Sequence, residues 1–296
     1  MAEPQGNREH KDRLFLKVFE DKEALLSLYN AVNGSDYENP EELEITTLDN
    51  VLYMRMKNDL SFLIDGSLNF YEHQSTFNPN MPLRGCFYMV KVYQEYVERR
   101  QLDIYSSTRL TLPTPRFIVF YNGTDRMKHM PELTLKLSDS FEKQEEEPAL
   151  ECKARVININ YGFNTEIMEK CPKLYEYSFL ISKIREETSQ GKKLEAAIGA
   201  AIDICVEEGI LTDLLTSYRM EVIGMLLTEY DEERHLKNTY EEGVKKGQKK
   251  GESIGEFRQL YKLIQKNFLT LHDAASANSM TEEQLMAAFK KYGITK

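Results

Sequence analysis

Two apolar runs separated by an Asp-Gly pair stand out within residues 57–74. The first run contains Leu60, Phe62, Leu63 and Ile64, and the second contains Leu68, Phe70 and Tyr71. Asp65-Gly66 between two runs of β-forming residues predicts a hairpin. Antiparallel pairing brings Asp59, at the start of the first strand, and Glu72, near the end of the second, to one end of the sheet. Glu72 and Gln74 are two residues apart, so they are expected to point to the same face.

The residues on either side of this hairpin alternate between helical and extended patterns. Apolar spacing predicts a helix over 12–33 that ends at Gly34, and a second helix over about 83–100. The second helix is expected to bury one stripe of residues: Phe87, Val90, Tyr93 and Val97. Extended segments are predicted at 41–56, 116–123 and 152–161, whereas 131–150 is expected to be a loop. This order predicts an α/β fold with one mixed sheet.

The rest of the chain shows helical patterns. Helices are predicted at 174–189, 192–208, 210–216 and 218–238. Glycines then recur every four residues among charged and polar residues, at positions 243, 247, 251 and 255. Each glycine costs a helix about 1 kcal/mol relative to alanine. The stretch is therefore interpreted first as a flexible hinge or charged linker, and second as a helix-pairing segment.

Three short helices are predicted over 257–292. Thr281 and Gln284 have the spacing of a capping box, and Thr270 is a candidate cap for the middle helix. Three short helices with brief turns fit a helix-turn-helix, but they fit a plain helical bundle or a dimerisation element equally well.

The composition predicts a soluble protein with a substantial core. The chain has 296 residues, of which 41% are hydrophobic and 29% charged, as in ordinary globular proteins. No apolar stretch approaches the ~20 residues that span a bilayer, and the first residues lack the apolar region of a signal peptide. The four cysteines are far apart and include no Cys-x-x-Cys pair. Reduced thiols, no structural zinc and a cytoplasmic location are expected.

The net charge of −10 argues against a protein that coats nucleic acid non-specifically, because such binding depends on phosphate neutralisation. The charge is uneven, however. An acidic cluster comprises Glu145, Glu146, Glu147 and Glu151, and a basic cluster comprises Lys245, Lys246, Lys249 and Lys250. An enzyme with a locally basic groove is therefore still compatible with this composition.

Two carboxylates and an amide at one end of a sheet can hold a divalent metal. Magnesium is commonly bound by one or two carboxylates, and water and substrate phosphate complete its coordination. Asp59 and Glu72 would supply the carboxylates, and the backbone carbonyl of His73 would add a third oxygen. Gln74 would orient water or contact a phosphate. From spacing alone, an exposed pair of acids at two strand ends is the simpler interpretation. The His73 side chain is expected to pack on the opposite face, and Asp65 is explained as a turn residue.

Longer stretches of sequence around the predicted hairpin carry further information. Residues 57–64 read Lys-Asn-Asp-Leu-Ser-Phe-Leu-Ile, and residues 71–84 read Tyr-Glu-His-Gln-Ser-Thr-Phe-Asn-Pro-Asn-Met-Pro-Leu-Arg. With the helix that opens at Asp12, the helix that carries Tyr88 and Tyr93, and the strand at 116–123, this stretch resembles the Rpn family. These are recombination-promoting nucleases, once labelled YhgA-like transposases, within the PD-(D/E)XK nuclease superfamily. The glycine-rich tail fits as well.

The resemblance implies a restriction-endonuclease-like core over 10–165, with a mixed central sheet flanked by helices. A helical extension (173–240), a charged linker or helix (241–256) and a small helical module (257–296) would follow. The implied activity is hydrolysis of DNA phosphodiester bonds with low sequence specificity, dependent on Mg²⁺ or Mn²⁺, with Asp59 and Glu72 as metal ligands. DNA is the implied partner, and no membrane is expected.

One position departs from the superfamily pattern. Gln74 stands where the superfamily usually has a lysine, so the positive charge near the reacting phosphate would come from elsewhere. Lys57 or Arg84 could supply it, although Arg84 is as readily explained by a salt bridge or a helix cap. Three hypotheses follow: a DNA endonuclease, a catalytically weakened DNA-binding protein of the same fold, and a protein that forms homo-oligomers through its C-terminal helices.

Overall fold

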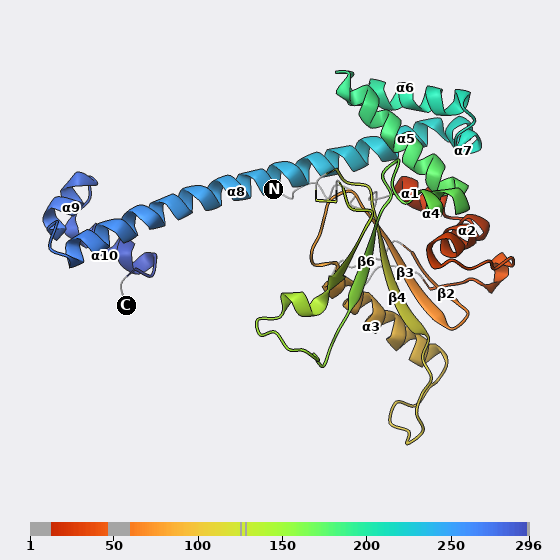
Figure 1. The fold of residues 1–296 in the computed structure, drawn as a ribbon, viewed down its shortest axis with the longest axis horizontal. Helices are drawn as coiled ribbons and strands as arrows, with labels where there is room; N and C mark the ends of the chain where they lie inside the picture. The colour runs from red at the N-terminus through yellow and green to blue at the C-terminus, as the bar shows by residue number, and fades with distance from the viewer. Residues whose placement is uncertain (1–12, 47–59, 125, 128, 295–296) are drawn as a thin grey trace, which may run out of the picture. The chain divides into compact units, whose positions relative to one another are not determined.

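The computed structural model describes residues 13–46, 60–124, 126–127 and 129–294. The chain separates into two compact units, residues 1–231 and 232–296. The larger unit contains a six-stranded mixed sheet with helices on both faces, and the C-terminal region is helical (Figure 1). The predicted α/β fold class is therefore confirmed.

The sheet has the strand order β1-β2-β3-β4-β6-β5. Its strands are β1 (Glu44–Ile45), β2 (Leu60–Ile64), β3 (Ser67–Gln74), β4 (Thr114–Tyr121), β5 (Glu132–Lys136) and β6 (Lys153–Asn158). Strands β3, β4 and β6 are parallel, whereas β1, β2 and β5 are antiparallel to their neighbours. The three parallel strands end together at Gln74, Tyr121 and Asn158. We call this end of the sheet the carboxyl edge.

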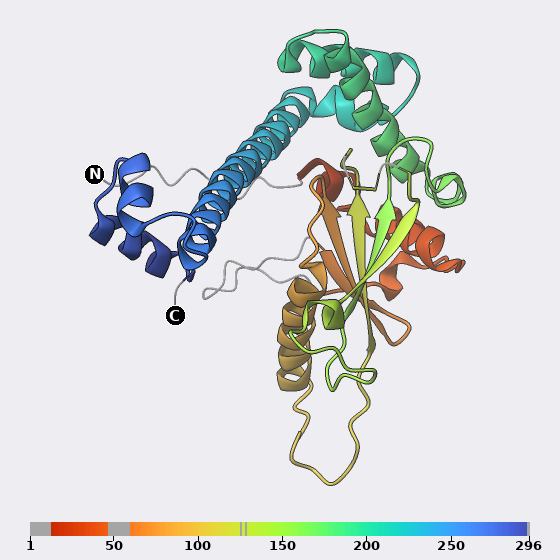
Figure 2. The same ribbon diagram turned by 60° about the vertical axis from the view of Figure 1, so that its left-hand side comes forward.

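Helices cover the two faces of the sheet unequally. The helices are α1 (Arg13–Val18), α2 (Lys22–Asn33), α3 (Met81–Arg99), α4 (Thr165–Lys170), α5 (Pro172–Ser189), α6 (Leu194–Glu207), α7 (Thr212–Ser217), α8 (Arg219–Gln265), α9 (Leu271–Ala277) and α10 (Glu282–Lys291). Helix α3 lies against one face of the sheet (Figure 2), which we call the α3 face. Phe70, Val119 and Val156 belong to the core on this face. Helices α1, α2 and α5 pack on the other, the α5 face, with Tyr71, Phe120 and Ile157.

The predicted hairpin is present. Ile64 pairs with Ser67, so Asp65 and Gly66 form a two-residue turn between β2 and β3. Both residues have positive φ, 45° and 66°, as the tight turns that match the strand twist require. Gly34 also ends α2 as predicted, with φ of 67°.

Two predictions about elements are wrong. The helix expected over 12–33 is two helices, because Asp21 caps a new helix by accepting a hydrogen bond from the Ala24 amide at 2.8 Å. The expected loop over 131–150 contains the edge strand β5, followed by a 3-10 turn, Leu137–Ser140. Strand β5 pairs on one side only, with β6, and its side chains are exposed or half-buried. It therefore lacks the apolar run that marked the inner strands.

The buried stripe of α3 is also different from the prediction. Phe87 and Val90 are 41% and 52% exposed, whereas Met81, Gly85, Tyr88 and Val92 are buried. Gly85 explains the orientation, since a Cβ atom there would lie 2.3 Å from the Phe117 ring of β4. The helix approaches the sheet through its smallest residue, and this turns two large apolar side chains towards solvent.

The smaller unit consists of the C-terminal part of α8 with α9 and α10 (Figure 1). Its core comprises Ala274, Ala275, Leu285 and Phe289, with Phe257, Leu260, Tyr261 and Ile264 of α8 packed against it. The capping box of Thr281 and Gln284 and the Thr270 cap are both present. The backbone of the glycine-rich stretch 243–255 is helical and belongs to α8.

Candidate functional site

Glu72 lies on β3, two residues before the carboxyl edge, and its side chain is fully buried on the α3 face. Its neighbours in the parallel ladder show why the position is buried: Glu72 pairs with Val119 of the central strand β4. An isolated carboxylate at such a place would be costly. Arg84 offsets part of this cost by forming an ion pair, with 3.0 Å between its Nη2 and Glu72 Oε2.

Arg84 reaches Glu72 because α3 begins at the carboxyl edge and Arg84 is in its first turn. Its guanidinium also donates to the Tyr88 hydroxyl one turn later, from Nε at 3.2 Å and from Nη2 at 2.8 Å. About a third of the Arg84 side chain remains exposed. The result is a partly solvated cation held against a buried carboxylate. Tyr88 was not predicted as part of this arrangement, and its i+4 spacing from Arg84 is the sequence signal that was overlooked.

Gln74 ends β3 on the same face as Glu72 and is half-buried. It pairs with Tyr121 in the ladder, and its backbone carbonyl accepts a hydrogen bond from the Asn122 amide at 3.1 Å. The strand geometry therefore places a carboxylate and an amide side by side at the end of one strand.

The His73 side chain points to the α5 face, away from Glu72. It is fully buried, stacks on Phe15 of α1 with 4.9 Å between ring centroids, and contacts the Tyr177 hydroxyl of α5 through Nε2 at 3.0 Å. Tyr177 also accepts a hydrogen bond from Asn122 Nδ2 at 3.1 Å. These contacts fix the β3 backbone beside Glu72 but keep the imidazole out of the candidate site. From the sequence, only the backbone carbonyl of His73 was expected in the candidate site.

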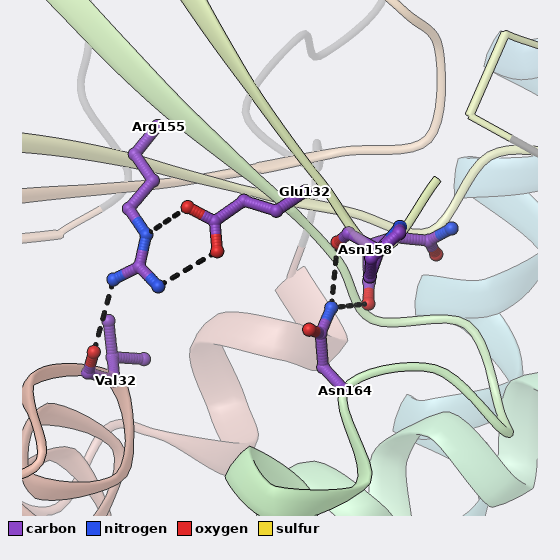
Figure 3. Close-up of polar contacts among 6 residues, drawn as sticks. Val32, Glu132, Arg155, Asn158 and Asn164 are labelled. Atoms are coloured by element: carbon purple, nitrogen blue, oxygen red, sulfur yellow. Dashed lines mark hydrogen bonds and ion pairs between the residues drawn. The ribbon is translucent and has the colours of Figure 1, made fainter. Parts of the chain in front are cut away.

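A network of asparagines orders the loops that follow β4 and β6. Asn158 Nδ2 donates to the carbonyls of Met127 and Met130. Asn164 Nδ2 donates to the Asn158 carbonyl at 2.8 Å (Figure 3). Asn160 Nδ2 donates to the Gly123 carbonyl at 2.9 Å. The two loops at the carboxyl edge are therefore joined by side-chain hydrogen bonds.

Figure 3 also shows a second polar cluster, on the α5 face. Arg155 of β6 forms a bidentate ion pair with Glu132 of β5, with 2.9 Å between Nη2 and Oε2. Its Nη1 donates to the Val32 carbonyl at the end of α2, at 3.1 Å. The two side chains thus bind each other, and Arg155 also binds the end of α2. This cluster ties α2 and β5 to the sheet, and we assign it a structural role.

Asp59 and Lys57, two of the predicted site residues, lie outside the described residues. The structure nevertheless shows where the chain enters the hairpin, because Leu60 opens β2 opposite Tyr71, the residue before Glu72. Strand β2 therefore begins at the carboxyl edge. Asp59 immediately precedes Leu60 in the sequence.

A divalent cation such as Mg²⁺ needs hard oxygen ligands gathered at one place. In the part of the chain that the structure describes, no three His, Cys, Asp or Glu side chains gather in a group that could hold a metal ion. Glu72 contributes one hard carboxylate, which suits Mg²⁺, but one carboxylate in an ion pair is a minimal site. The fit to magnesium therefore depends on Asp59.

Cysteine chemistry is disfavoured at the buried thiols. Burial raises the pKa of Cys152 to about 11 and that of Cys205 to about 12, and burial also raises the pKa of Cys171. A thiol with a raised pKa remains protonated at neutral pH, so it is a poor nucleophile.

Phe77 and Arg126 were not predicted from the sequence. Phe77 follows β3, and its ring packs edge-on against Tyr121 with 6.4 Å between centroids. Arg126 lies in the loop after β4, with its guanidinium carbon 5.8 Å from the Phe77 ring centroid. A cation thus stands beside the carboxyl edge. The run of polar residues that follows Asn122-Gly123 was the available signal.

Comparison of the chain with protein-family models, with curated proteins and with solved structures gives no match. Within the described residues, none of the helices has the length and apolar character needed to cross a bilayer.

Proposed function

We propose that this chain is a metal-dependent deoxyribonuclease whose centre lies at the carboxyl edge around Glu72. The observation that supports this most is the position of Glu72, a fully buried carboxylate at the end of a central parallel strand. Carboxyl ends of strands in open α/β sheets are where ligands commonly bind. Two other carboxylates among the described residues are buried, Glu187 and Glu229, and both lie on helices rather than in the sheet.

Glu72 and Asp59 would hold Mg²⁺ or Mn²⁺, and the His73 backbone carbonyl would add a third oxygen. When bound, the cation would neutralise charge on the phosphate and lower the pKa of a bound water. Glu72 suits this role because its strand is fixed on both sides, by β2 and by β4. The hydrogen-bonded His73 side chain further fixes the backbone next to it.

Arg84 is the candidate for the charge that Gln74 does not provide. Its guanidinium touches Glu72 and is one-third exposed, so a phosphate at the carboxyl edge could share its donors. Gln74 would orient a water molecule or donate to a phosphate oxygen through its amide. Lys57 is a further candidate phosphate contact. The DNA partner, low sequence specificity, a part in recombination and a cytoplasmic location belong to this proposal.

The Glu72–Arg84 ion pair also favours a second candidate. A carboxylate already neutralised by an arginine has less affinity for a cation, and Gln74 provides no formal charge. We therefore keep as the alternative a nuclease-fold protein that binds DNA, or assembles through its C-terminal helices, with little or no turnover.

Metal binding and plasmid cleavage distinguish these candidates. The nuclease is expected to nick supercoiled plasmid with Mg²⁺ or Mn²⁺ and to lose this activity in Asp59→Asn and Glu72→Gln. The alternative predicts DNA binding without nicking and no metal binding that Glu72→Gln removes, measured by calorimetric titration with Mn²⁺. Glu187→Gln is the matched control, because Glu187 is also buried and also ion-paired, with Lys192.

A further inference from the structure

The proposed substrate is a polyanion, whereas the chain carries a net charge of −10. Binding therefore requires cations concentrated near the carboxyl edge, since phosphate neutralisation drives association with DNA. Arg84 is only partly available for this purpose, because Glu72 already engages it. A second source of positive charge on the same side of the sheet would resolve this conflict.

Arg126 has the features of such a source. It is exposed, and among the residues that the structure describes no carboxylate forms an ion pair with it. Its guanidinium lies over the Phe77 ring, which in turn packs against Tyr121. Tyr121 pairs with Gln74 and belongs with Phe77 to the core of the α3 face. The chain of contacts thus leads from Arg126 to the strand end that carries Glu72 and Gln74.

The aromatic contact restricts the arginine without consuming its charge. A guanidinium over an aromatic face keeps its N–H donors at the ring edge available for an acceptor. Phosphate oxygens match that planar donor geometry and are often bound by two parallel hydrogen bonds. An exposed guanidinium that lies over an aromatic ring, and that no carboxylate of the described residues pairs with, is therefore suited to binding a phosphate beside a candidate phosphodiesterase centre.

We propose that Arg126 binds a backbone phosphate of the nucleic acid that flanks the scissile position, and that Phe77 positions the Arg126 side chain for this contact. The inference rests on the proposed nuclease function and deepens it by naming a substrate contact. A contact to the backbone reads no sequence, in agreement with the low specificity proposed above.

The test measures binding of a fluorescent duplex to the full chain by anisotropy, in EDTA and at several salt concentrations. Arg126→Gln is expected to weaken binding roughly tenfold. It is also expected to reduce the slope of log affinity against log salt by about one. Arg109→Gln is the matched control: Arg109 is also an exposed loop arginine, but its loop leads into the opposite end of β4. We expect Arg109→Gln to bind like the wild type.

Two substitutions of Phe77 test the positioning role. Phe77→Leu is expected to lower affinity by severalfold with an unchanged salt slope, because the charge of Arg126 remains. Phe77→Tyr, which keeps an aromatic face, is expected to restore the affinity. If Phe77→Leu binds like the wild type, the positioning role is wrong.

The possible results distinguish a failure of the Arg126 contact from a failure of the proposed nuclease function. If the wild type binds the duplex, and Arg126→Gln and Arg109→Gln have the same affinity and the same slope of log affinity against log salt, the phosphate contact is wrong. The nuclease proposal would then still stand. Neither binding nor nicking of any DNA by the wild type would overturn both.

Discussion

The Glu72 carboxylate and the Arg84 guanidinium form an ion pair, with 3.0 Å between Oε2 and Nη2, that joins the end of β3 to the first turn of α3. One partner is buried and the other is one-third exposed. The contact therefore does two things at once. It stabilises a carboxylate that the sheet removes from water, and it places a cation where the proposed reaction needs one.

The first prediction concerns the stability of this pair. Arg84→Gln removes the Arg84 ion pair from buried Glu72, and we expect a loss of about 1–3 kcal/mol, less than for a fully buried pair because Arg84 is partly solvated. Adding Glu72→Gln should recover part of the loss, so the two substitutions should not be additive. A double-mutant cycle of urea unfolding at neutral pH measures this. Additive single and double variants would show that the pair contributes no coupling energy.

The second prediction concerns the approach of α3 to the sheet. Gly85→Ala would place a Cβ atom 2.3 Å from the Phe117 ring, so we expect it to destabilise the protein by about 1–3 kcal/mol. Gly199→Ala in α6 is the matched control, because no atom lies within 4 Å of a Cβ built there. A helical glycine with free space should gain up to about 1 kcal/mol on this change. Thermal unfolding of both variants checks the opposite signs, and equal shifts would contradict the close approach.

The third prediction concerns pH. Tyr37 donates a hydrogen bond to Asp65 Oδ2 at 2.6 Å, and this bond raises the pKa of Tyr37 to about 12. The folded state thus keeps the phenol proton to higher pH than the unfolded chain, whose tyrosine titrates near 10. Between about pH 10 and about pH 12 the folded state binds more protons, so its stability should fall as pH rises.

Urea unfolding of wild type and Tyr37→Phe at pH 9, 10 and 11 measures this effect. The difference between the two free energies of unfolding should shrink with rising pH. Tyr105→Phe is the control, because Tyr105 is 92% exposed, and it should show no such trend. A constant difference for Tyr37→Phe would contradict the hydrogen bond.

The fourth prediction concerns the buried contacts behind the site. Tyr177→Phe removes the hydroxyl that lies 3.0 Å from His73 Nε2 and 3.1 Å from Asn122 Nδ2. We expect a loss of about 1–3 kcal/mol, because polar groups inside the core lose a partner. Tyr175→Phe, on the same helix but 37% exposed, should change stability by less than about 0.5 kcal/mol. Equal effects in urea unfolding would contradict the buried arrangement.

Local signals in the sequence predicted much of this fold. The Asp65-Gly66 turn, the Gly34 cap and the Thr281 capping box each follow from a side chain or backbone preference within a few residues. The buried strand β4 was predicted from its apolar run. Such features need no information from distant parts of the chain.

The features that the sequence did not predict depend on partners elsewhere in the chain. The buried stripe of α3 depends on Phe117, some thirty positions away, which accepts Gly85 and no larger residue. Strand β5 pairs with β6, and the alternation in its sequence Glu-Leu-Thr-Leu-Lys, which is typical of a half-buried strand, was overlooked because the segment is short and polar. Periodicity within one segment cannot reveal either partner.

The candidate site shows the same division. Alternation along β3 predicted that Glu72 and Gln74 share a face and that His73 faces away. The Glu72–Arg84 contact and the Arg126–Phe77 contact join residues on different elements or loops. They could be recognised only once the sheet order and the start of α3 were known.

Plasmid nicking by the full chain with Mg²⁺ or Mn²⁺ tests the proposed nuclease centre most directly. Wild type and Glu187→Gln should convert supercoiled plasmid to the nicked form at similar rates. Glu72→Gln should lose at least about a hundredfold in rate while retaining its circular dichroism spectrum and cooperative unfolding. A folded Glu72→Gln variant that nicks plasmid as fast as the wild type would contradict a nuclease centre at Glu72.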